Sequence, residues 1–497
     1  MGVKYWYDSG KIRVICYISF ISSFFLEKLI VIELKKQSLS ETFSLYFEKR
    51  MARILLLGII QGFPFVLIYT ALTLWLRDNE FSRSQVGLLS LIAVVYGFNW
   101  LWAPLVDRIR IPWITKKIGH RRSWIVIMQL IILLSLVSWG LIDPKENIWI
   151  VGLVGLIIAI SSATQDIVTD ALRIEQVGKN EAHSMSAGAG VMVIGWFTGY
   201  KIGGIITLFV ADYFEKLGVQ NYWQITFLLL TVIIIACNIA LMFVTEQQST
   251  EKQIEQKKTD QFIVDKLGSS NSITNIVAWI VGTVTGPFIS FFKSKGVKIG
   301  IYIIIFLFLF KIGEAFLGKM SIIFYDDMGF SKKEIAIYSK GYGWVITVVF
   351  TLIGSFFAIR SGLVKAMIIA GVMMASTNLL FSVLAWYGKS ELLFATAVIL
   401  DEITAAISTV VFVAFVSFLV DRTYTASHYA LMASLATLGK NVFSAFSGVV
   451  VDKLEFLSSP GNLHNHWAIF FIITTLMVIP SLVFLWIIKD KLNLREK

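Results

Sequence analysis

The chain has 497 residues, of which 56% are hydrophobic and only 15% are charged, and its mean hydropathy is +0.74. A soluble domain of this length would expose far more charge, so the composition excludes a water-soluble globular protein and indicates an all-α polytopic membrane protein. The formal net charge of +11 does not indicate nucleic-acid binding, because the basic residues are scattered between apolar runs and form no single stripe.

Residues 1–50 are predicted to be an N-terminal extension. The apolar run at 14–26 is too short to span a membrane, and Glu27 and Lys28 interrupt it. Two interpretations stay open: an interfacial or signal-like segment, or a start codon assigned too far upstream.

Twelve apolar runs follow, each close to the roughly 20 residues that a membrane-spanning helix needs. They cover 53–76, 85–106, 124–142, 148–172, 184–210, 223–244, 299–325, 335–359, 364–386, 391–420, 427–451 and 466–488. The polar residues of 245–272 predict a linker, and 273–292, which contains Pro287, is expected to lie on the membrane surface as an amphipathic segment.

This pattern predicts two six-helix halves, 51–244 and 299–497, joined by the linker 245–298. Such an architecture is typical of major facilitator transporters, whose substrate site lies between the halves. The loop 107–122 holds six Lys and Arg residues and the loop 143–147 only one. By the positive-inside rule, 107–122 and both ends of the twelve-helix core are expected to be cytoplasmic.

The run 148–172 continues into charged residues without a turn, through Asp166, Asp170 and Arg173. A charge at bilayer depth costs roughly 2.5–3.5 kcal/mol on insertion scales, so it persists only where it is paired or lines a wet cavity. At helical spacing the three side chains share one face. They indicate either a structural clamp at a gate or a functional site, with Gln165 placed deeper in the membrane.

From about Phe43 onward the chain resembles the AmpG-like muropeptide permeases, a branch of the major facilitator superfamily that also contains acetyl-CoA transporters. Motifs in matching order carry this resemblance: Gln61-Gly62-Phe63-Pro64, Thr73-Leu74-Trp75-Leu76, Leu101-Trp102-Ala103-Pro104, Asp107-Arg108, Gly119-His120-Arg121-Arg122-Ser123-Trp124, Ser162-Ala163-Thr164-Gln165-Asp166-Ile167, Lys311-Ile312-Gly313-Glu314-Ala315-Phe316 and Thr425-Ala426-Ser427-His428-Tyr429-Ala430-Leu431. The family pattern is altered at Asn99, Trp196-Phe197, Asp401-Glu402 and His428.

The resemblance implies a bacterial inner-membrane secondary transporter that imports anhydro-muropeptides by alternating access, driven by the proton-motive force. Because cavity cations are lost or moved at the altered positions, an importer of another polar anionic solute, such as acetyl-CoA or a peptide, is the alternative. We expect a monomer in the bilayer, with a small solute and protons as its only partners, and no nucleic acid.

Candidate substrate-binding residues are those that place a hydrogen-bonding, aromatic or cationic group within the predicted spans. They are Gln165, Tyr96, Asn99, Trp100, Lys201, Lys311 and Lys340. Amides suit the hydroxyl and N-acetyl groups of a sugar, and lysines suit carboxylates. Tyr96 and Trp100 are expected one helical turn apart, on one aromatic face. The alternatives are a locked ion pair for Lys311 and a snorkelling side chain for Lys340.

Proton coupling requires an acid whose protonation responds to burial and to the movement of a partner. Glu314, Asp401, Glu402 and Asp170 are the candidates. Asp107, Arg108, Asp166 and Arg173 are assigned to gating, since an acid at a helix end can meet an arginine or the N-terminus of a neighbouring helix when that side is closed.

No catalytic, metal or cofactor site is expected. Cys16 and Cys237 lie in apolar surroundings, and the sequence shows no serine-nucleophile motif, paired-histidine metal motif or phosphate loop. A membrane enzyme or a non-transporting sensor is therefore the third and least favoured interpretation.

Overall fold

A computed structural model of the chain describes residues 2–8, 11–17, 31–34, 39–81, 85–86, 89, 91–178, 181–246, 250–267, 272–330, 343–444, 446–457 and 464–496. The chain divides into two compact units, Met1–Glu48 and Lys49–Lys497, which are described separately.

The first unit contains the strands of the described chain. β1 (Gly2–Asp8), β2 (Lys11–Tyr17) and β3 (Val31–Leu34) form an antiparallel sheet in that order. Gly2 pairs with Tyr17, and Ile12 pairs with Leu34. α1 (Leu39–Ser44) and a 3₁₀ turn (Leu45–Phe47) follow. The extension thus differs from the helical core, and its aromatic and β-branched residues favour strands. Part of the expected interfacial segment, 18–30, lies outside the described residues.

The helices of the first half of the second unit follow the predicted runs. They are α2 (Lys49–Val66), a π-helical turn (Leu67–Ala71), α3 (Leu72–Asp78), the 3₁₀ segments Leu91–Gly97 and Asn99–Leu101, α5 (Ala103–Arg108), α6 (Ile114–Ile118), α7 (His120–Leu141), α8 (Ile148–Glu175), α9 (Ala182–Lys216) and α10 (Tyr222–Leu241).

The linker and the second half are also helical. They contain α11 (Thr250–Leu267), α12 (Ser272–Lys295), α13 (Val297–Phe310), α14 (Ile312–Asp327), α16 (Gly343–Ser361), α17 (Leu363–Tyr387), α18 (Glu391–Leu419), a 3₁₀ turn (Arg422–Tyr424), α19 (Thr425–Ser444), α20 (Ser447–Leu454), a 3₁₀ turn (Glu455–Leu457), α21 (Asn465–Leu476) and α22 (Ile479–Glu496).

Eleven helical stretches of the described chain are long and apolar enough to cross a membrane, and each overlaps one of the twelve predicted runs. The chain is thus a multi-pass helical membrane protein. The exception is 85–106, where Gln85, Val86 and Leu89 are helical and the described residues from Leu91 on form 3₁₀ segments and the short α5. Pro104 at the start of α5 lacks the N–H that would continue a preceding helix. The prediction of one continuous helix there is wrong.

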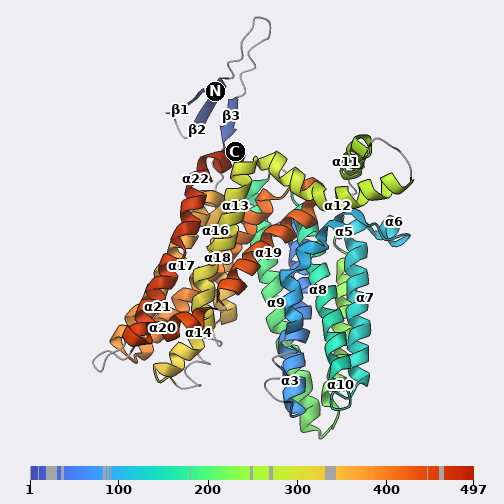
Figure 1. Cartoon of the computed structure of the whole chain (residues 1–497), viewed down its shortest axis with the longest axis vertical. Coiled ribbons are helices and arrows are strands. Elements are labelled where there is room, and N and C mark those ends of the chain that lie inside the picture. The colour runs from blue at the N-terminus through green and yellow to red at the C-terminus, as the bar shows by residue number, and fades with distance from the viewer. Residues whose placement is uncertain are drawn as a thin grey trace, which may run out of the picture. The chain divides into compact units, whose positions relative to one another are not determined.

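A helix pair within α12, Val277–Thr283 and Thr285–Lys295, also passes this test of length and composition, but it is bent by 48°. Pro287 accounts for the bend, because it cannot donate to the carbonyl of Thr283 and its ring crowds that turn. Figure 1 shows α12 running across one end of the helices, and not along them. Its predicted position on the membrane surface stays a prediction.

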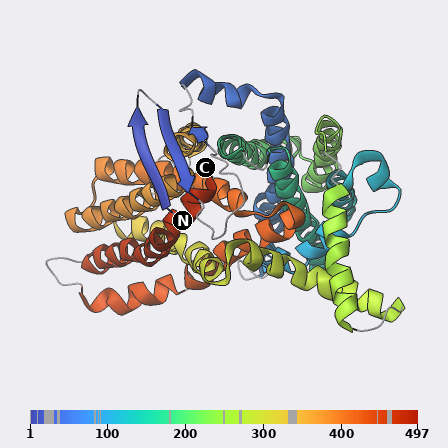
Figure 2. The same cartoon turned by 90° about the horizontal axis from the view of Figure 1, so that it is seen from above.

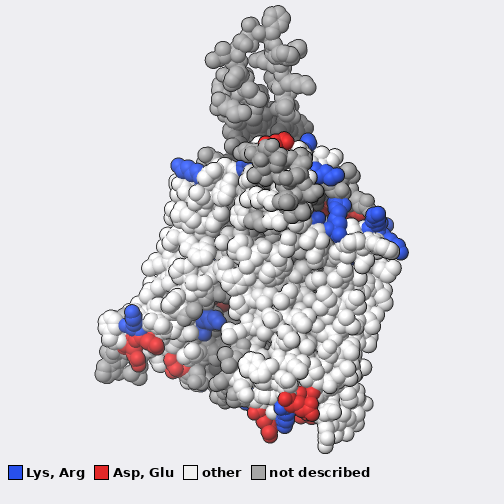
Figure 3. Space-filling view, turned by 45° about the vertical axis from the view of Figure 1, so that its right-hand side comes forward, with Lys and Arg blue, Asp and Glu red and all other residues white. Residues whose placement is uncertain are grey.

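The two halves form neighbouring bundles, blue to green and yellow to red (Figures 1 and 2). We call the end that carries α6, α11 and α12 the basic end. In Figure 3, Lys and Arg gather toward this end, most of the visible Asp and Glu lie at the other, and the band between is nearly uncharged. In Figure 1 the ribbons of the halves draw apart toward the end that carries α3 and α14.

Glycines allow α2 and α9 to pack with their backbones in contact. A Cβ added at Gly62 would lie 2.1 Å from the carbonyl oxygen of Trp196, and one at Gly199 would lie 2.3 Å from that of Ile59. Small residues allow helices to approach this closely in a membrane. This packing fixes the position of the first half's long helices.

Gly199→Ala is expected to destabilise the protein strongly, because its new methyl group would meet backbone that cannot move aside. Overpacking typically costs about 1–3 kcal/mol. Gly204→Ala is the matched control, since nothing lies within 4 Å of a Cβ there. Thermal unfolding in detergent measures the difference, and equal midpoints for the two variants would contradict this packing.

Candidate functional site

Asp107, at the end of α5, joins the halves at the basic end. Its carboxylate is fully buried and accepts hydrogen bonds from the Arg121 guanidinium at 2.7 Å and from the Ser427 backbone N–H at 2.7 Å. The Ala426 N–H and the Ser427 hydroxyl also donate to it. These two residues form the first turn of α19, whose backbone donors have no helical partner and favour a negative charge.

Arg121 and Glu246 organise the N-terminus of α7 beneath this contact. The Arg121 guanidinium also binds Glu175 at 3.1 Å. Glu246, beyond the end of α10, accepts the backbone N–H groups of Arg121 and Arg122 at 2.9 and 3.0 Å. Burial raises the pKa of Glu246, although these two N–H groups oppose the shift. Asp107 is therefore held by a fixed arginine and does not depend on a mobile surface charge.

Arg173 makes a second connection between the halves. Its side chain is 1% exposed, binds Asp170 at 3.1 Å on its own helix and donates to the Ser417 hydroxyl of α18 at 2.9 Å. The guanidinium carbon lies 5.4 Å from the ring centroid of Tyr429 on α19. The face that Asp170 and Arg173 were predicted to share thus contacts the other half.

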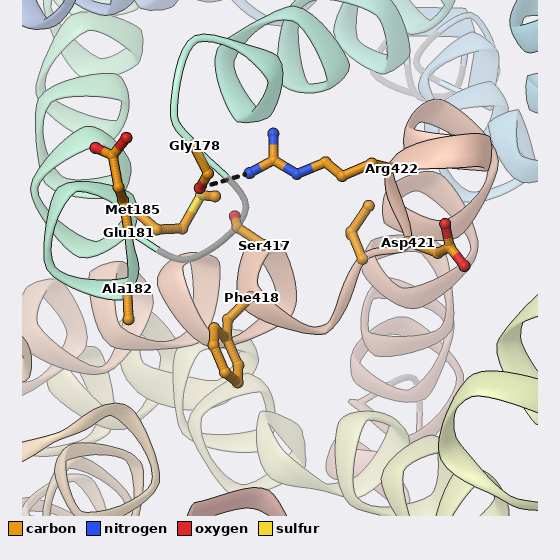
Figure 4. Close-up of a pocket in the computed structure, with 9 residues that line it drawn as sticks. Gly178, Glu181, Ala182, Met185, Ser417, Phe418, Asp421 and Arg422 are labelled. Atoms are coloured by element: carbon orange, nitrogen blue, oxygen red, sulfur yellow. Dashed lines mark hydrogen bonds between the residues drawn. The ribbon is translucent and has the colours of Figure 1, made fainter. Parts of the chain in front are cut away.

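A pocket of about 230 Å³ lies between the α8–α9 turn and the end of α18 (Figure 4). Arg422 reaches from the second half into it and donates to the carbonyl oxygens of Ile174 and Gly178, the latter at 3.3 Å. Met185 and Ser417 line the pocket from opposite halves. Because both halves form its walls, their separation at the basic end would open it.

The linker is bound to both halves at the same end. Arg108, whose side chain is 2% exposed, forms an ion pair with Asp260 of α11 at 2.8 Å and donates to the Trp279 carbonyl of α12 at 3.2 Å. On the other half, Ser290 of α12 donates to the Asp421 carboxylate at 2.7 Å. Arg108 was predicted to act beside Asp107, and it contacts the linker instead.

Asp421 is a strong anchor for α12. Burial alone would raise its pKa, but hydrogen bonds from the Thr423 N–H and the Ser290 hydroxyl outweigh burial, so the pKa is lowered. The carboxylate therefore stays charged, and a charged acceptor makes the stronger hydrogen bond.

His428 holds α12 through both ring nitrogens. The backbone N–H of Asp421 donates to Nδ1 at 3.1 Å, so Nδ1 carries no proton. Nε2 must then carry the hydrogen that it donates to the Pro287 carbonyl, 2.7 Å away. The imidazole is 1% exposed and is fixed in this tautomer by its neighbours.

His428→Leu is expected to loosen α12, because it leaves the Pro287 carbonyl and the Asp421 N–H unsatisfied, at about 1–3 kcal/mol for each buried group. His428→Gln places a donor where Nε2 lies, whereas His428→Asn reaches only the position of Nδ1. A nitroxide at Ile289, which is 58% exposed, should become more mobile in the Leu and Asn variants and not in the Gln variant. Equal mobility in all three would exclude His428 as the anchor.

The polar side chains of α8 below Arg173 are tied to α2. Gln61 donates to Asp170 at 3.1 Å, and Gln165, which is 0% exposed, donates to the Ile60 carbonyl at 2.8 Å. Oδ1 of Asp166 is buried and has no hydrogen-bond partner among the described residues. Gln165 was predicted to bind substrate, and in this conformation its amide faces α2 and not solvent.

Lys311 and Glu314 form the polar centre of the second half. Lys311 lies at a one-residue turn between α13 and α14, inside the single membrane-crossing stretch Val297–Tyr325. Its ammonium still binds Glu314 and also donates to Ser408 at 2.8 Å and Thr409 at 3.2 Å. Discontinuous helices are typical of transporter substrate sites.

Gly313 places this break against α21, since a Cβ there would lie 2.4 Å from the Thr474 carbonyl. Asp401 of α18 accepts a long, 3.5 Å hydrogen bond from Thr377. Its neighbour Glu402 interacts electrostatically with Asp401. The predicted coupling acids Glu314, Asp401 and Glu402 thus all belong to the second half, and only Asp170 belongs to the first.

The remaining predicted ligands lie in different surroundings. Tyr96 packs against Phe65, with ring centroids 4.6 Å apart, and Asn99 accepts a hydrogen bond from Ser434 of α19 at 2.8 Å. Lys201 lies 6.0 Å from the Phe197 ring. Lys340 falls outside the described residues.

The predicted aromatic face of Tyr96 and Trp100 assumed an α-helical turn between them. The two residues lie in separate 3₁₀ segments, Leu91–Gly97 and Asn99–Leu101. A 3₁₀ helix has three residues per turn, so residues four apart do not stack as they do in an α-helix.

Sequence reasoning missed several partners: Gln61, Glu175, Asp260, Ser417, Ser427 and Tyr429. Gln61, Ser427 and Tyr429 lie in motifs that carried the family resemblance. Membership of these motifs was the only feature of the sequence that could have indicated a functional role for them. Within the described ranges no three His, Cys, Asp or Glu side chains gather as a metal site would require.

The Major Facilitator Superfamily model matches residues 54–339, more than half of the chain. The chain therefore belongs to the major facilitator superfamily.

Its similarity to curated proteins extends over almost the whole length. It is 28% identical to a putative transporter AmpG 4 of Rickettsia conorii over 90% of this chain and 99% of that one. It is 25% identical to the anhydromuropeptide permease of Escherichia coli K12 over 91% of this chain and 82% of that one. The resemblance to AmpG-like permeases is thereby confirmed.

Solved structures share the fold. The proton:xylose symporter XylE gives a TM-score of 0.59 at 13% identity, covering 90% of this chain and 96% of that chain. The transporter FucP, in an outward conformation, gives 0.60 at 12% identity, covering 88% and 99%. The predicted major facilitator fold is confirmed. The superfamily model and the AmpG relatives make the chain a membrane transporter with a small-molecule substrate.

Proposed function

We propose that this transporter is a proton-driven importer of anhydro-muropeptides in a bacterial inner membrane. The similarity to the Escherichia coli anhydromuropeptide permease over 91% of the chain supports the substrate class. The contact of Asp107 with α19 supports the mechanism. Its carboxylate is fully buried between the two halves, so the halves either stay closed around it or separate and break its hydrogen bonds.

In the proposed cycle the structure represents the state closed at the basic end. Positively charged loops favour the cytoplasmic side, so this state is closed to the cytoplasm. Import then requires Asp107, Arg173 and Arg422 to release their partners in the opposite half, while the linker limits how far the halves separate at this end.

The orientation is tested by a cysteine at Lys116, an exposed position of α6. In a chain without Cys16 and Cys237, an impermeant thiol reagent is expected to label it in inverted vesicles and not in intact cells. A cysteine at Lys145, in the loop 143–147, should show the opposite behaviour. Labelling of the Lys116 position in intact cells would reverse the proposed topology.

The Lys311–Glu314 pair provides a chemical route to coupling. An anhydro-muropeptide carries carboxylates that need a cation, and Lys311 is already bound by Glu314. A proton on Glu314 neutralises this competitor, so the ammonium becomes available to a substrate carboxylate. Proton and anionic solute then bind together, as symport requires.

A polar anion of another kind, such as acetyl-CoA or a short peptide, is the second candidate. One position supports it: by the family resemblance Asn99 stands where AmpG-like permeases usually have a lysine, and its side chain accepts a hydrogen bond from Ser434. That side chain supplies no charge for a muropeptide carboxylate.

The substrate is tested with right-side-out vesicles that contain this protein. Labelled anhydro-muropeptide should accumulate, and unlabelled anhydro-muropeptide should compete more strongly than acetyl-CoA or short peptides. Stronger competition by either alternative would reassign the substrate. Conversion of the solute without accumulation would indicate an enzyme.

A further inference from the structure

An apolar groove of about 320 Å³ lies on the first half between α5, α7 and α8. Its walls include Leu105 and Ile109 from α5 and the residue after it, Met128 from α7, and Ile157 and Ile160 from α8. Leu105, Ile109, Ile157 and Ile160 are between 37% and 44% exposed, so the groove is open to the surroundings of the helices. In a membrane protein those surroundings are lipid.

Both indole N–H groups of the groove, and the Thr164 hydroxyl, have hydrogen-bond partners within the protein. Trp102 Nε1 donates to the Thr164 hydroxyl at 3.0 Å, and that hydroxyl donates to the Ile160 carbonyl at 2.8 Å. Trp124 Nε1 donates to the Ile109 carbonyl at 2.9 Å. A polar solute would find few partners here, whereas a hydrocarbon chain needs none.

One end of the groove reaches the basic loop. Ile109 lines the groove, Arg110 follows it, and α6 adds Lys116 and Lys117, all three of them exposed. No Asp or Glu occurs from 108 to 122.

Two further arginines of the loop are neutralised within the protein. Arg108 is paired with Asp260, and Arg121 with Asp107 and Glu175. Lys116 and Lys117 are exposed and add positive charge at the end of the apolar groove.

We propose that this groove binds an acyl chain of an anionic phospholipid whose headgroup contacts Lys116 and Lys117. Apolar area holds the chain, and each surface Lys or Arg adds electrostatic attraction for the headgroup. Because α5 forms one wall and carries Asp107, the bound lipid packs directly against the helix that closes the basic end. The site is separate from the proposed substrate route and does not depend on the proposed substrate.

The test is native mass spectrometry of the full-length protein, titrated with phosphatidylglycerol and, in parallel, with phosphatidylcholine. The wild-type protein should retain phosphatidylglycerol preferentially. Lys116→Gln combined with Lys117→Gln should weaken that binding about thirtyfold, the size expected for two lost surface cations. Lys145→Gln combined with Lys216→Gln removes two exposed cations elsewhere and should leave it unchanged.

A groove-filling variant tests the acyl chain separately. Ile160→Trp should reduce retention of phosphatidylglycerol at least tenfold. The indole would displace part of the lipid's acyl chain from the groove, and two displaced methylene groups are enough for a loss of that order. Leu153→Trp, on the same helix and 58% exposed but not in the groove wall, should not. Equal retention of the two lipids by the wild type, or wild-type retention in the lysine variant, would overturn the proposal. The lysine changes are on the surface, so misfolding does not confound that result.

Discussion

Asp107→Asn is expected to reduce the rate of solute uptake about 100-fold. The amide keeps the shape of the side chain but leaves Arg121 with Glu175 as its only described acidic partner and weakens the contact with α19. Breaking a buried ion pair costs roughly 3 kcal/mol at the low end, and about 1.4 kcal/mol is a factor of ten in an equilibrium. The closed state should therefore lose about two orders of magnitude in population, and the cycle should stall in the separated state.

The loss of closure is measured by alkylation of a cysteine at Met185, in a chain without Cys16 and Cys237. Met185 is 4% exposed and lines the pocket between the halves, so it should react faster when they separate. Asp143→Asn, in the loop 143–147, is the matched control and should change neither uptake nor alkylation. Wild-type values for both in Asp107→Asn would remove Asp107 from the gate.

Glu314→Gln is expected to abolish accumulation driven by a proton gradient while solute exchange continues. The amide cannot take up a proton, but it no longer competes for Lys311 as a carboxylate does, so substrate should still bind. Accumulation should fall to the level reached by downhill equilibration. The measurement compares gradient-driven uptake with exchange of preloaded substrate in the same vesicles.

Asp401→Asn is the second variant, since the Asp401 carboxylate accepts a long hydrogen bond from Thr377 and lies on α18 with the Lys311 partners Ser408 and Thr409. Glu455→Gln, at an exposed position of a 3₁₀ turn, serves as the control and should accumulate normally. If Glu314→Gln and Asp401→Asn both still accumulate solute, the coupling group lies elsewhere, and Asp170 is the next candidate.

The spans could be predicted from the sequence because the bilayer imposes their length. Eleven predicted runs correspond to membrane-crossing helices. The sequence did not reveal local departures from the α-helix: the 3₁₀ segments within 85–106, and the one-residue turn at Lys311 inside the span Val297–Tyr325. Hydropathy averages over a window and does not detect a few residues whose backbone departs from the helix. Such departures depend on tertiary contacts, such as that of Gly313 with α21.

The candidate site was predictable in its chemistry but not in its pairings. The sequence indicated that Asp107 could meet either an arginine or a helix N-terminus, and in the structure it contacts both, Arg121 and the first turn of α19. Asp107 and Ser427 are 320 positions apart, and no local pattern relates them. Lys311 and Glu314, three positions apart, were predicted as neighbours and do pair, because short sequence separation keeps them close even across a break.

The central claim is that a proton gradient moves an anhydro-muropeptide through this chain, and purified protein in proteoliposomes tests it most directly. With the outside more acidic, labelled anhydro-muropeptide should accumulate inside above its external concentration, and a protonophore should collapse that accumulation. If the solute only equilibrates, or if the protonophore has no effect on its accumulation, the proton-coupled mechanism is wrong.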